Sequence, residues 1–235
     1  MDRSNPRLKV VDHQDIFLDS TMLPSFNSNS IISNLHHIEG LSEHYIYFND
    51  DVFLGRWVEP AQFFLGSGIA LVSPANNRRR FGEARVEEEP HFNISRNIRS
   101  ILQDAFGVTV SRAIKHTPHP QIRSLHYQME SRFREHYQST WSHPFRHHDD
   151  IAADQLHHYY AQITGRAVPG QLKYSYINLM DETHSSRLSS ILALRNRDVF
   201  CLNDAPTGGR PVPEDLVQHF LDGYFPVPSS FEVPE

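Results

Sequence analysis

The sequence predicts an α/β fold: a largely parallel sheet flanked by helices, with a helical C-terminal portion. Short apolar segments rich in β-branched and aromatic residues alternate with segments whose apolar residues recur every three or four positions. This alternation is typical of parallel sheets covered by helices. The chain of 235 residues is 39% hydrophobic and 21% charged, as a globular protein should be, and we treat residues 1–235 as a single domain.

Four segments have the composition of short strands. They are residues 8–11, 45–48, 68–73 and 198–202. The second and the fourth are each followed directly by an asparagine, Asn49 and Asn203. Residues 73–90, by contrast, are polar and carry both charge signs, and we expect them to form a mobile loop.

Four further segments carry apolar residues at helical spacing. They are residues 94–105, 122–133, 149–160 and 213–220. Gly107 follows the first of them, in the position of a C-cap glycine. Asp149 and Asp150 are candidate N-caps of the third, while Pro213 should open the last helix and Gly223 should end it.

The composition excludes several classes of protein. With a net charge of −6, the chain has no basic field that would attract nucleic acid or anionic lipid. No apolar run is long enough for a membrane span, and the first residues do not resemble a secretion signal. Cys201 is the sole cysteine, which excludes an intramolecular disulfide, and we expect a cytoplasmic protein. The 16 histidines invite a metal or acid–base role, and homo-oligomer formation is left open.

Asn49, Asp50 and Asp51 directly follow a predicted buried strand. Ligands of open α/β sheets bind beyond the carboxyl ends of strands, so these side chains are well placed to hold a divalent cation. A solvated turn is an equally good interpretation of the three residues alone. Asn203 and Asp204 follow another strand, and this second Asn-Asp pair favours one site shared by both turns.

Two other motifs could contribute to that site. His116 lies in a His-Thr-Pro-His-Pro motif, whose prolines would hold the imidazole in the fixed direction that a general base requires. Arg146 lies in a Pro-Phe-Arg-His motif, where an arginine can bind phosphate at two points. In isolation, surface histidines at a helix entry and an Arg–Asp pair at a helix N-terminus are the commoner interpretations. A zinc site at His116 and His119 lacks an evident third ligand.

Taken together, these motifs resemble the conserved regions of the Stealth family of sugar-1-phosphate transferases. Residues 23–28, 35–44 and 45–55 resemble the second region, 116–120 and 144–147 the third, and 200–204 and 224–232 the fourth. The order and spacing agree over nearly the whole chain. The resemblance divides it into region two at about 1–72, the loop at 73–90, region three at about 110–165 and region four at about 195–235.

The resemblance implies a fold and a reaction. Family members include bacterial capsule polymerases and the animal N-acetylglucosamine phosphotransferase that tags lysosomal enzymes. They transfer a hexose-1-phosphate from a nucleotide sugar to an acceptor hydroxyl and release a nucleoside monophosphate. For this chain the resemblance implies a GT-A-like or Rossmann-like sheet, a nucleotide sugar donor, a polysaccharide acceptor and a role in exopolysaccharide or capsule biosynthesis.

The resemblance also assigns roles to residues of this sequence. It implies catalytic His116, Arg146 and Asp51, cofactor-binding Asn49 and Asn203, and metal-binding Asp50, Asp51 and Asp204. His116 would lie near the acceptor, and Arg146 would bind phosphate. Because the candidate ligands are oxygen atoms, Mg²⁺ (or Mn²⁺) fits them better than Zn²⁺.

Three departures from the family's pattern concern activity. The family's first conserved region has no counterpart, so the sequence resembles a member truncated at its N-terminal side. Ile32 stands where the family has an acidic residue, and His37 replaces the arginine of its Leu-His-Arg-Ile-Glu-Gly motif. We therefore expect the chain alone to transfer sugar phosphate slowly or not at all. Two alternatives stay open: a catalytically impaired remnant or partner subunit, and a metal-dependent phosphohydrolase.

Overall fold

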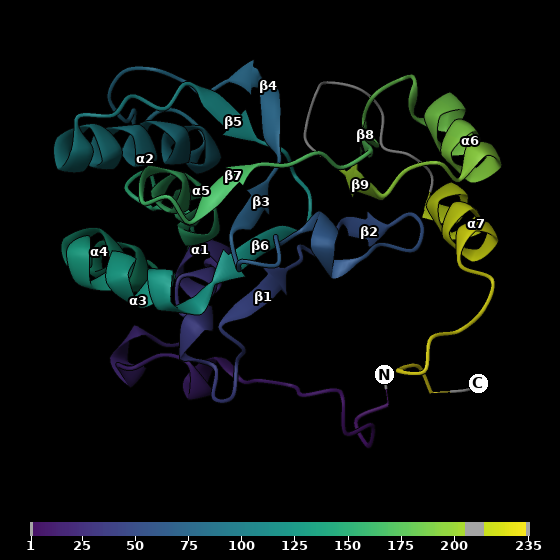
Figure 1. Cartoon of the computed structure of the whole chain (residues 1–235), viewed down its shortest axis with the longest axis horizontal. Helices are drawn as coiled ribbons and strands as arrows, with labels where there is room; N and C mark the ends of the chain where they lie inside the picture. The colour runs from purple at the N-terminus through teal and green to yellow at the C-terminus, as the bar shows by residue number, and fades with distance from the viewer. Residues whose placement is uncertain (1, 205–213, 234–235) are drawn as a thin grey trace.

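The computed structural model describes residues 2–204 and 214–233, which form a mixed α/β fold, as the sequence predicts (Figure 1). The α-helices in this part of the chain are α1 (Ser28–Ile32), α2 (Pro90–Phe106), α3 (Arg123–Arg132), α4 (Arg134–Ser142), α5 (Ala153–Ile163), α6 (His184–Leu194) and α7 (Glu214–Tyr224). The strands are β1 (His44–Tyr47), β2 (Val52–Leu54), β3 (Ala70–Val72), β4 (Pro74–Arg78), β5 (Arg112–Ile114), β6 (His119–Ile122), β7 (Ala167–Pro169), β8 (Tyr174–Asn178) and β9 (Val199–Asn203).

The strands of the described residues form four small sheets instead of the largely parallel, Rossmann-like sheet that we predicted. β1 pairs with β6, β4 with β5, and β2 with β9, and all three pairs are antiparallel. The parallel pairs are β3 with β7 and β8 with β9. The arrangement is therefore mostly antiparallel.

The lengths of the connections explain this difference. Neighbouring parallel strands need a crossover of about a dozen residues or more. Only residues 48–51 separate β1 from β2, and no α-helix lies between β2 and β4. These strands therefore pair with strands that are distant in the sequence. β8 and β9 have a long enough connection, because α6 lies between them, and they form a parallel βαβ unit.

Three apolar clusters hold the described fold together, and the two largest involve the α-helices. The larger one lies among α2, α3, α5 and the strands β3, β6 and β7, with fully buried Ile98 and Leu125 near its centre. The smaller one lies between the β8–β9 pair and the helices α6 and α7, where Ile177, Phe200 and Phe220 are buried. The second core forms the helical C-terminal portion that the sequence predicts, at the right of Figure 1.

The predicted helices are present, with differences at their ends. Gly107 ends α2 in the left-handed conformation, at φ 66°, as predicted. α5 begins after Ala152 without a side-chain cap, so Asp149 and Asp150 do not cap it. Gly223 lies inside α7 instead of ending it, and Pro213 lies outside the described residues. Among the helices that are described, none combines the length and apolar character needed to cross a bilayer.

The structure also differs from the prediction in two segments outside the helices. Residues 8–11 form no strand. The segment 73–90, expected to be a loop, begins with β4, whose partner is β5. After β4, Glu88 forms ion pairs with Arg80 at 3.2 Å and with the buried Arg96 of α2 at 2.9 Å. The sequence alone did not reveal this arrangement, because one partner of Glu88, the buried Arg96, lies in the following helix.

Candidate active site

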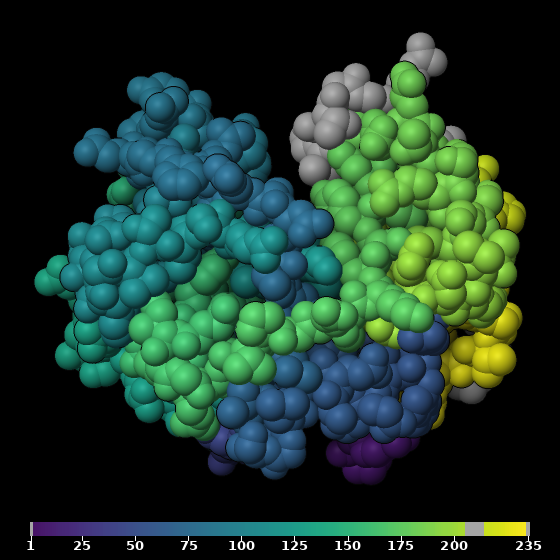
Figure 2. All heavy atoms as spheres, turned by 45° about the horizontal axis from the view of Figure 1, so that its top comes forward, coloured from purple at the N-terminus to yellow at the C-terminus, as the bar shows by residue number. Residues whose placement is uncertain are grey.

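A cleft of about 950 Å³ lies between the part of the chain that contains α2 and the part that contains β8, β9 and α7. Figure 2 shows the surface hollowed between the part coloured blue to teal and the part coloured green. The residues that the sequence predicts for the site all line this cleft: Asn49, Asp50, Asp51, His116, Arg146, Asn203 and Asp204. The structure therefore brings together side chains from four segments that are distant in the sequence.

Asp51 is the most highly connected of these residues. Its Oδ1 lies 2.9 Å from Nε2 of His116, and its Oδ2 accepts hydrogen bonds from Nδ2 of Asn203 at 3.0 Å and from the thiol of Cys201 at 3.2 Å. Burial by itself would raise the pKa of this carboxyl group, but the hydrogen bonds from His116 and Asn203 outweigh burial and lower the pKa to about 2. Asp51 is therefore an anion at neutral pH.

The antiparallel pairing of β2 with β9 places Asp51 beside Asn203. Val52 lies opposite Cys201, and the N–H of Leu202 donates to the carbonyl oxygen of Asp51 at 2.9 Å. The start of β2 thus meets the end of β9. On the neighbouring strand β8, the hydroxyl of Tyr176 donates to Oδ1 of Asn203 at 2.8 Å. The turn at residues 49–51 and the turn at residues 203–204 face one cleft because β2, which begins directly after Asp51, pairs with β9, which ends at Asn203.

The proton arrangement of His116 follows from its contacts. Nε2 of His116 lies 2.9 Å from Oδ1 of Asp51 and 3.3 Å from Nδ2 of Asn49. The carboxylate can only accept and the amide nitrogen can only donate, so Nε2 cannot serve both. The shorter, charge-assisted contact favours a proton on Nε2, directed at Asp51. A neutral His116 then carries its lone pair on Nδ1.

Asp50 and Asp204 differ from Asp51 in their surroundings. Both are exposed and line the cleft. Within residues 2–204 and 214–233, neither carboxylate has a hydrogen-bond or ion-pair partner. Their negative charges are therefore available to a cation or to a cation-bound ligand.

Arg146 lines another part of the cleft, in the loop that follows α4. It is exposed, and its Nε and Nη2 donate to Oγ of Ser28 in α1 at 3.2 and 2.8 Å. The pKa of Tyr47 depends on the charged groups around this tyrosine. Burial and then the nearby carboxylates, including Asp50 and Asp51, raise that pKa, whereas Arg146 lowers it. The guanidinium and the two carboxylates therefore act on the same region of the cleft.

Buried Asp150 holds the loop that carries Arg146. Its Oδ2 accepts from the backbone N–H of His147 at 2.8 Å and from Nδ2 of Asn27 at 2.8 Å, and its Oδ1 lies 2.9 Å from Nδ1 of His143. The sequence presented this residue as a helix cap. The structure shows instead that it ties the loop 143–150 to the turn before α1.

The sequence did not indicate a second His–Asp pair on the cleft wall. Nδ1 of His119 lies 2.9 Å from Oδ2 of Asp154, and both side chains are buried. Burial opposes ionisation of Asp154, but the bond to His119 keeps the pKa of this carboxyl group below its ordinary value. An acidic residue on the buried face of a predicted helix was the signal that could have revealed it. Ile32 also lines the cleft.

Side chains with metal-ligating atoms also meet at the cleft. In the described part of the chain, three groups bring three such atoms within 4.8 Å of one another: His36 with His37 and Glu130, Asp51 with His116 and Cys201, and His147 with His148 and Asp149. The Asp51 group offers mixed oxygen, nitrogen and sulfur atoms, which do not suit Mg²⁺. Burial and the adjacent Asp51 raise the pKa of the Cys201 thiol, which keeps it protonated. The carboxylates of Asp50 and Asp204, which have no partner among the described residues, are oxygen ligands of the kind that Mg²⁺ prefers.

Family models for three conserved regions match this chain. Conserved region 2 of the Stealth proteins matches residues 1–72, conserved region 3 matches residues 115–162, and conserved region 4 matches residues 189–235. The matched segments contain all the cleft residues that the sequence predicted. The chain therefore belongs to the Stealth family.

Several curated relatives carry the name exopolysaccharide phosphotransferase. One from Streptomyces coelicolor is 40% identical over 99% of this chain and 40% of its own length. One from Nocardia farcinica is 38% identical over 97% of this chain and 46% of its own length. CpsY of Mycobacterium tuberculosis is 36% identical over 97% of this chain and 44% of its own length. This chain therefore spans less than half the length of these relatives.

Proposed function

We propose that this chain carries the reaction centre of a phosphotransferase in exopolysaccharide or capsule synthesis. In this proposal, a hexose-1-phosphate passes from a nucleotide sugar to a hydroxyl group of an acceptor saccharide. The observation that carries the proposal is the joint placement of the Asp51–His116 pair and Arg146 in one cleft. Phosphoryl transfer depends mainly on positioning and charge neutralisation, and these residues can supply both.

His116 is the proposed general base. Asp51 accepts the Nε2–H of His116, which fixes the ring orientation and leaves the lone pair on Nδ1. Nδ1 takes the proton of the acceptor hydroxyl as its oxygen attacks the phosphorus that bears the hexose. The phosphoanhydride bond breaks, and the nucleoside monophosphate leaves with the bonding electron pair. A new phosphodiester then joins hexose and acceptor.

Arg146 is the proposed phosphate ligand. Its two nitrogen donors already point together at the single hydroxyl oxygen of Ser28, in a geometry that a phosphate oxygen could share or replace. The first turn of α2, which places His91 in the cleft, adds the positive end of a helix dipole to the same cleft. Both features favour an anionic donor.

Asp50 and Asp204 are the proposed ligands of a Mg²⁺ or Mn²⁺ ion, with Asp51 beside them. When bound, such an ion would neutralise charge on the donor's phosphates. Asn49 and Asn203 support this region through their contacts with His116 and Asp51. The proposal therefore keeps Asp50, Asp51 and Asp204 as the metal ligands that the resemblance implied. Asp51 in addition accepts hydrogen bonds from its neighbours.

The direct test is a product assay with purified chain, a panel of nucleotide sugars, short saccharide acceptors and Mg²⁺. We expect slow acceptor-dependent release of nucleoside monophosphate, because Ile32 stands where the family resemblance implies a carboxylate, and a phosphodiester product detected by mass spectrometry. His116→Ala should abolish both, whereas His136→Ala, at an exposed position outside the cleft, should not. Release of phosphate to water without an acceptor would favour the phosphohydrolase alternative instead.

Ile32 supports a second candidate function, that of an impaired remnant or partner subunit. Its apolar side chain lines the cleft at the position where the family resemblance implies a carboxylate. Ile32→Glu should raise the rate of monophosphate release if the missing carboxylate limits the reaction. An unchanged low rate in Ile32→Glu, with nucleotide sugar bound, would favour the partner-subunit function.

A further inference from the structure

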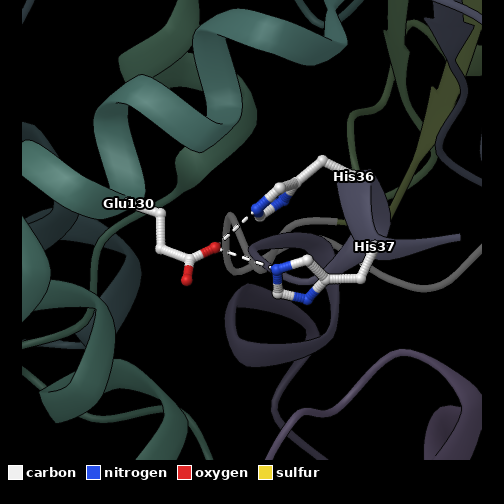
Figure 3. Close-up of side chains that lie close together, drawn as sticks. All are labelled: His36, His37 and Glu130. Carbon is white, nitrogen blue, oxygen red and sulfur yellow. Dashed lines mark hydrogen bonds and ion pairs between the residues drawn. The ribbon is translucent and has the colours of Figure 1, made fainter.

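A second cluster of ligating side chains lies outside the cleft, between a short 3₁₀ helix, η3 (Leu35–His37), and α3. Figure 3 shows His36 and His37 directing their rings at the carboxylate of Glu130. Nε2 of His36 lies 2.6 Å from Oε2 of Glu130, and Nε2 of His37 lies 2.9 Å from the same oxygen. Both nitrogens thus lie next to one carboxylate oxygen, and the three atoms lie within 4.8 Å of one another.

A hydrogen bond on the far side of His37 determines what its Nε2 can offer. Nδ1 of His37 lies 2.9 Å from the carbonyl oxygen of buried Ile16. A carbonyl oxygen only accepts, so the proton of a neutral His37 is on Nδ1 and its lone pair is on Nε2. That lone pair faces a carboxylate oxygen. Two acceptors this close require a positive charge between them.

Either a proton or a metal ion can supply that charge. A proton on Nε2 of His37 serves one pair of atoms. A divalent ion serves all three ligand atoms at once. In the described structure Nε2 of His36 lies beside the Glu130 carboxylate and Nδ1 has no hydrogen-bond partner, so without an ion the proton is on Nε2, and an ion bound at this point would displace it. The three ligands can therefore converge on one ion.

The surroundings resemble those of a built metal site. The side chain of His36 is 0% exposed and that of His37 is 7% exposed, while that of Glu130 is 21% exposed. A metal-bound histidine usually donates its other N–H to a carbonyl or carboxylate, as His37 does to Ile16. The exposed edge of Glu130 leaves access for water as a fourth ligand.

α3 holds the two histidines in place before any ion binds. Arg123, Tyr127 and Glu130 follow one another at helical spacing, so they share one face of α3. Nε of Arg123 donates to the carbonyl oxygen of His36 at 2.8 Å, and the hydroxyl of Tyr127 donates to the same oxygen at 3.0 Å. The backbone at His36 is therefore held by contacts that do not use its ring nitrogens, and the ring of His37 is held through Nδ1 by Ile16.

We propose that His36, His37 and Glu130 form a structural site for a divalent transition-metal ion, with Zn²⁺ as the best match. Two imidazoles, one carboxylate and an open fourth position suit Zn²⁺, whereas Mg²⁺ and Ca²⁺ prefer oxygen ligands throughout. The ion would connect η3, in the part matched by conserved region 2, to α3, in the part matched by conserved region 3. The site lies outside the catalytic cleft and does not depend on the proposed reaction.

The test measures zinc binding by the full chain after removal of metals with a chelator. We expect about one tightly bound Zn²⁺ per chain at this site, and Co²⁺ should give the absorption spectrum of a low-coordinate complex with nitrogen ligands. Glu130→Gln and His37→Gln should each weaken binding by more than about a hundredfold, since loss of outer partners alone costs 10–100-fold. His148→Gln and His116→Gln, which alter the other two candidate groups, should leave this binding unchanged.

Circular dichroism and thermal unfolding of each variant without metal separate loss of a ligand from loss of the fold. Zn²⁺ should raise the melting temperature of the unmutated chain and of His148→Gln, and should have no effect on Glu130→Gln or His37→Gln. The proposal is overturned if the unmutated chain binds no Zn²⁺, or if folded Glu130→Gln and His37→Gln bind it as the unmutated chain does. In either case the cluster is an imidazolium–carboxylate pair held together by a proton.

Discussion

The wall of the cleft that carries Asp51 consists of strands, whereas the wall that carries Arg146 consists of a loop and the short helix α1. On the first wall, the pairing of β2 with β9 fixes Asp51, and each of its carboxylate oxygens has a hydrogen-bond partner. On the second wall, Arg146 is exposed and donates to a serine hydroxyl, and buried Asp150 holds its loop. A fixed anion thus faces an adaptable cation. This difference suits a reaction in which the base must be aligned and the phosphate must enter and leave.

Asp51→Asn should have the largest effect on activity. The amide is nearly the same size, but it removes the charge and reverses the hydrogen-bond preference toward His116, so the base loses its orientation. We expect turnover to fall by about 10³–10⁴-fold. Turnover should be measured as release of nucleoside monophosphate, with thermal unfolding as the control for folding. A fall of less than about tenfold would show that the strand-built wall does not hold the base.

Arg146→Ala should come next, because it removes one charged phosphate ligand from the adaptable wall. The expected loss in kcat/KM is about 10²–10³-fold. Arg146→Lys should retain part of the activity, since it keeps the charge and loses the two-point contact. Arg134→Ala, on the exposed surface of α4, is the matched control and should behave like the unmutated chain. Equal activity of Arg146→Ala and Arg134→Ala would contradict the proposed role.

Asp150→Asn tests whether the second wall depends on its buried support. The substitution leaves buried donors without an acceptor, and we expect a loss of about 1–3 kcal/mol in the free energy of unfolding. KM for the donor should also rise, because the loop that carries Arg146 is released. If Asp150 acts through Arg146, the combined variant with Arg146→Ala should lose less activity than the two single losses together. Additive losses would argue that Asp150 has only a structural role.

The smallest expected effect is the loss, at acid pH, of the contribution that Asp51 makes to the stability of the folded chain. In the folded chain its pKa is about 2, below the ordinary value of 3.8, so its contribution to stability is present above about pH 4 and is lost as the pH falls toward 2. The difference in urea midpoint between the unmutated chain and Asp51→Asn should therefore shrink across this range. Because Asp51 is partly exposed, we expect a small difference. A difference that is constant from pH 5 to about pH 2.5 would indicate that the carboxylate is not ionised as described.

The sequence was sufficient for the helices and insufficient for the sheet, and the residues that it proposed for a site lie on one cleft. Apolar spacing and Gly107 located α2 because these signals are local to the helix. The segment before Asn49 was correctly predicted as a strand, but its partner β6 begins at His119, and nothing near residue 49 in the sequence indicates that pairing. Strand partners depend on chain closure over long distances, which a local pattern does not contain.

The same distinction applies to the site. Asp51, His116 and Arg146 were predicted through motifs that each lie in a few consecutive residues, and the structure places all three on one cleft. The pairing of His119 with Asp154 joins residues from β6 and α5, and the cluster at Glu130 joins α3 to η3. Such side-chain pairs have no local signature. Their assembly follows from how the helices pack on the strands.

The pairing of β2 with β9 has a consequence for how the chain acquires its cleft. Asp51 and Asn203 are 152 positions apart, and closing a loop of that length costs about 4 kcal/mol in chain entropy. At synthesis rates of about 5–20 residues per second, β2 leaves the ribosome roughly 8–30 s before β9 can reach it. During that interval the edge of β2 that will receive β9 is unpaired, and unpaired strand edges are where chains associate wrongly. The step that completes the surroundings of Asp51 is thus also the step that ends this exposure, late in the folding of the chain.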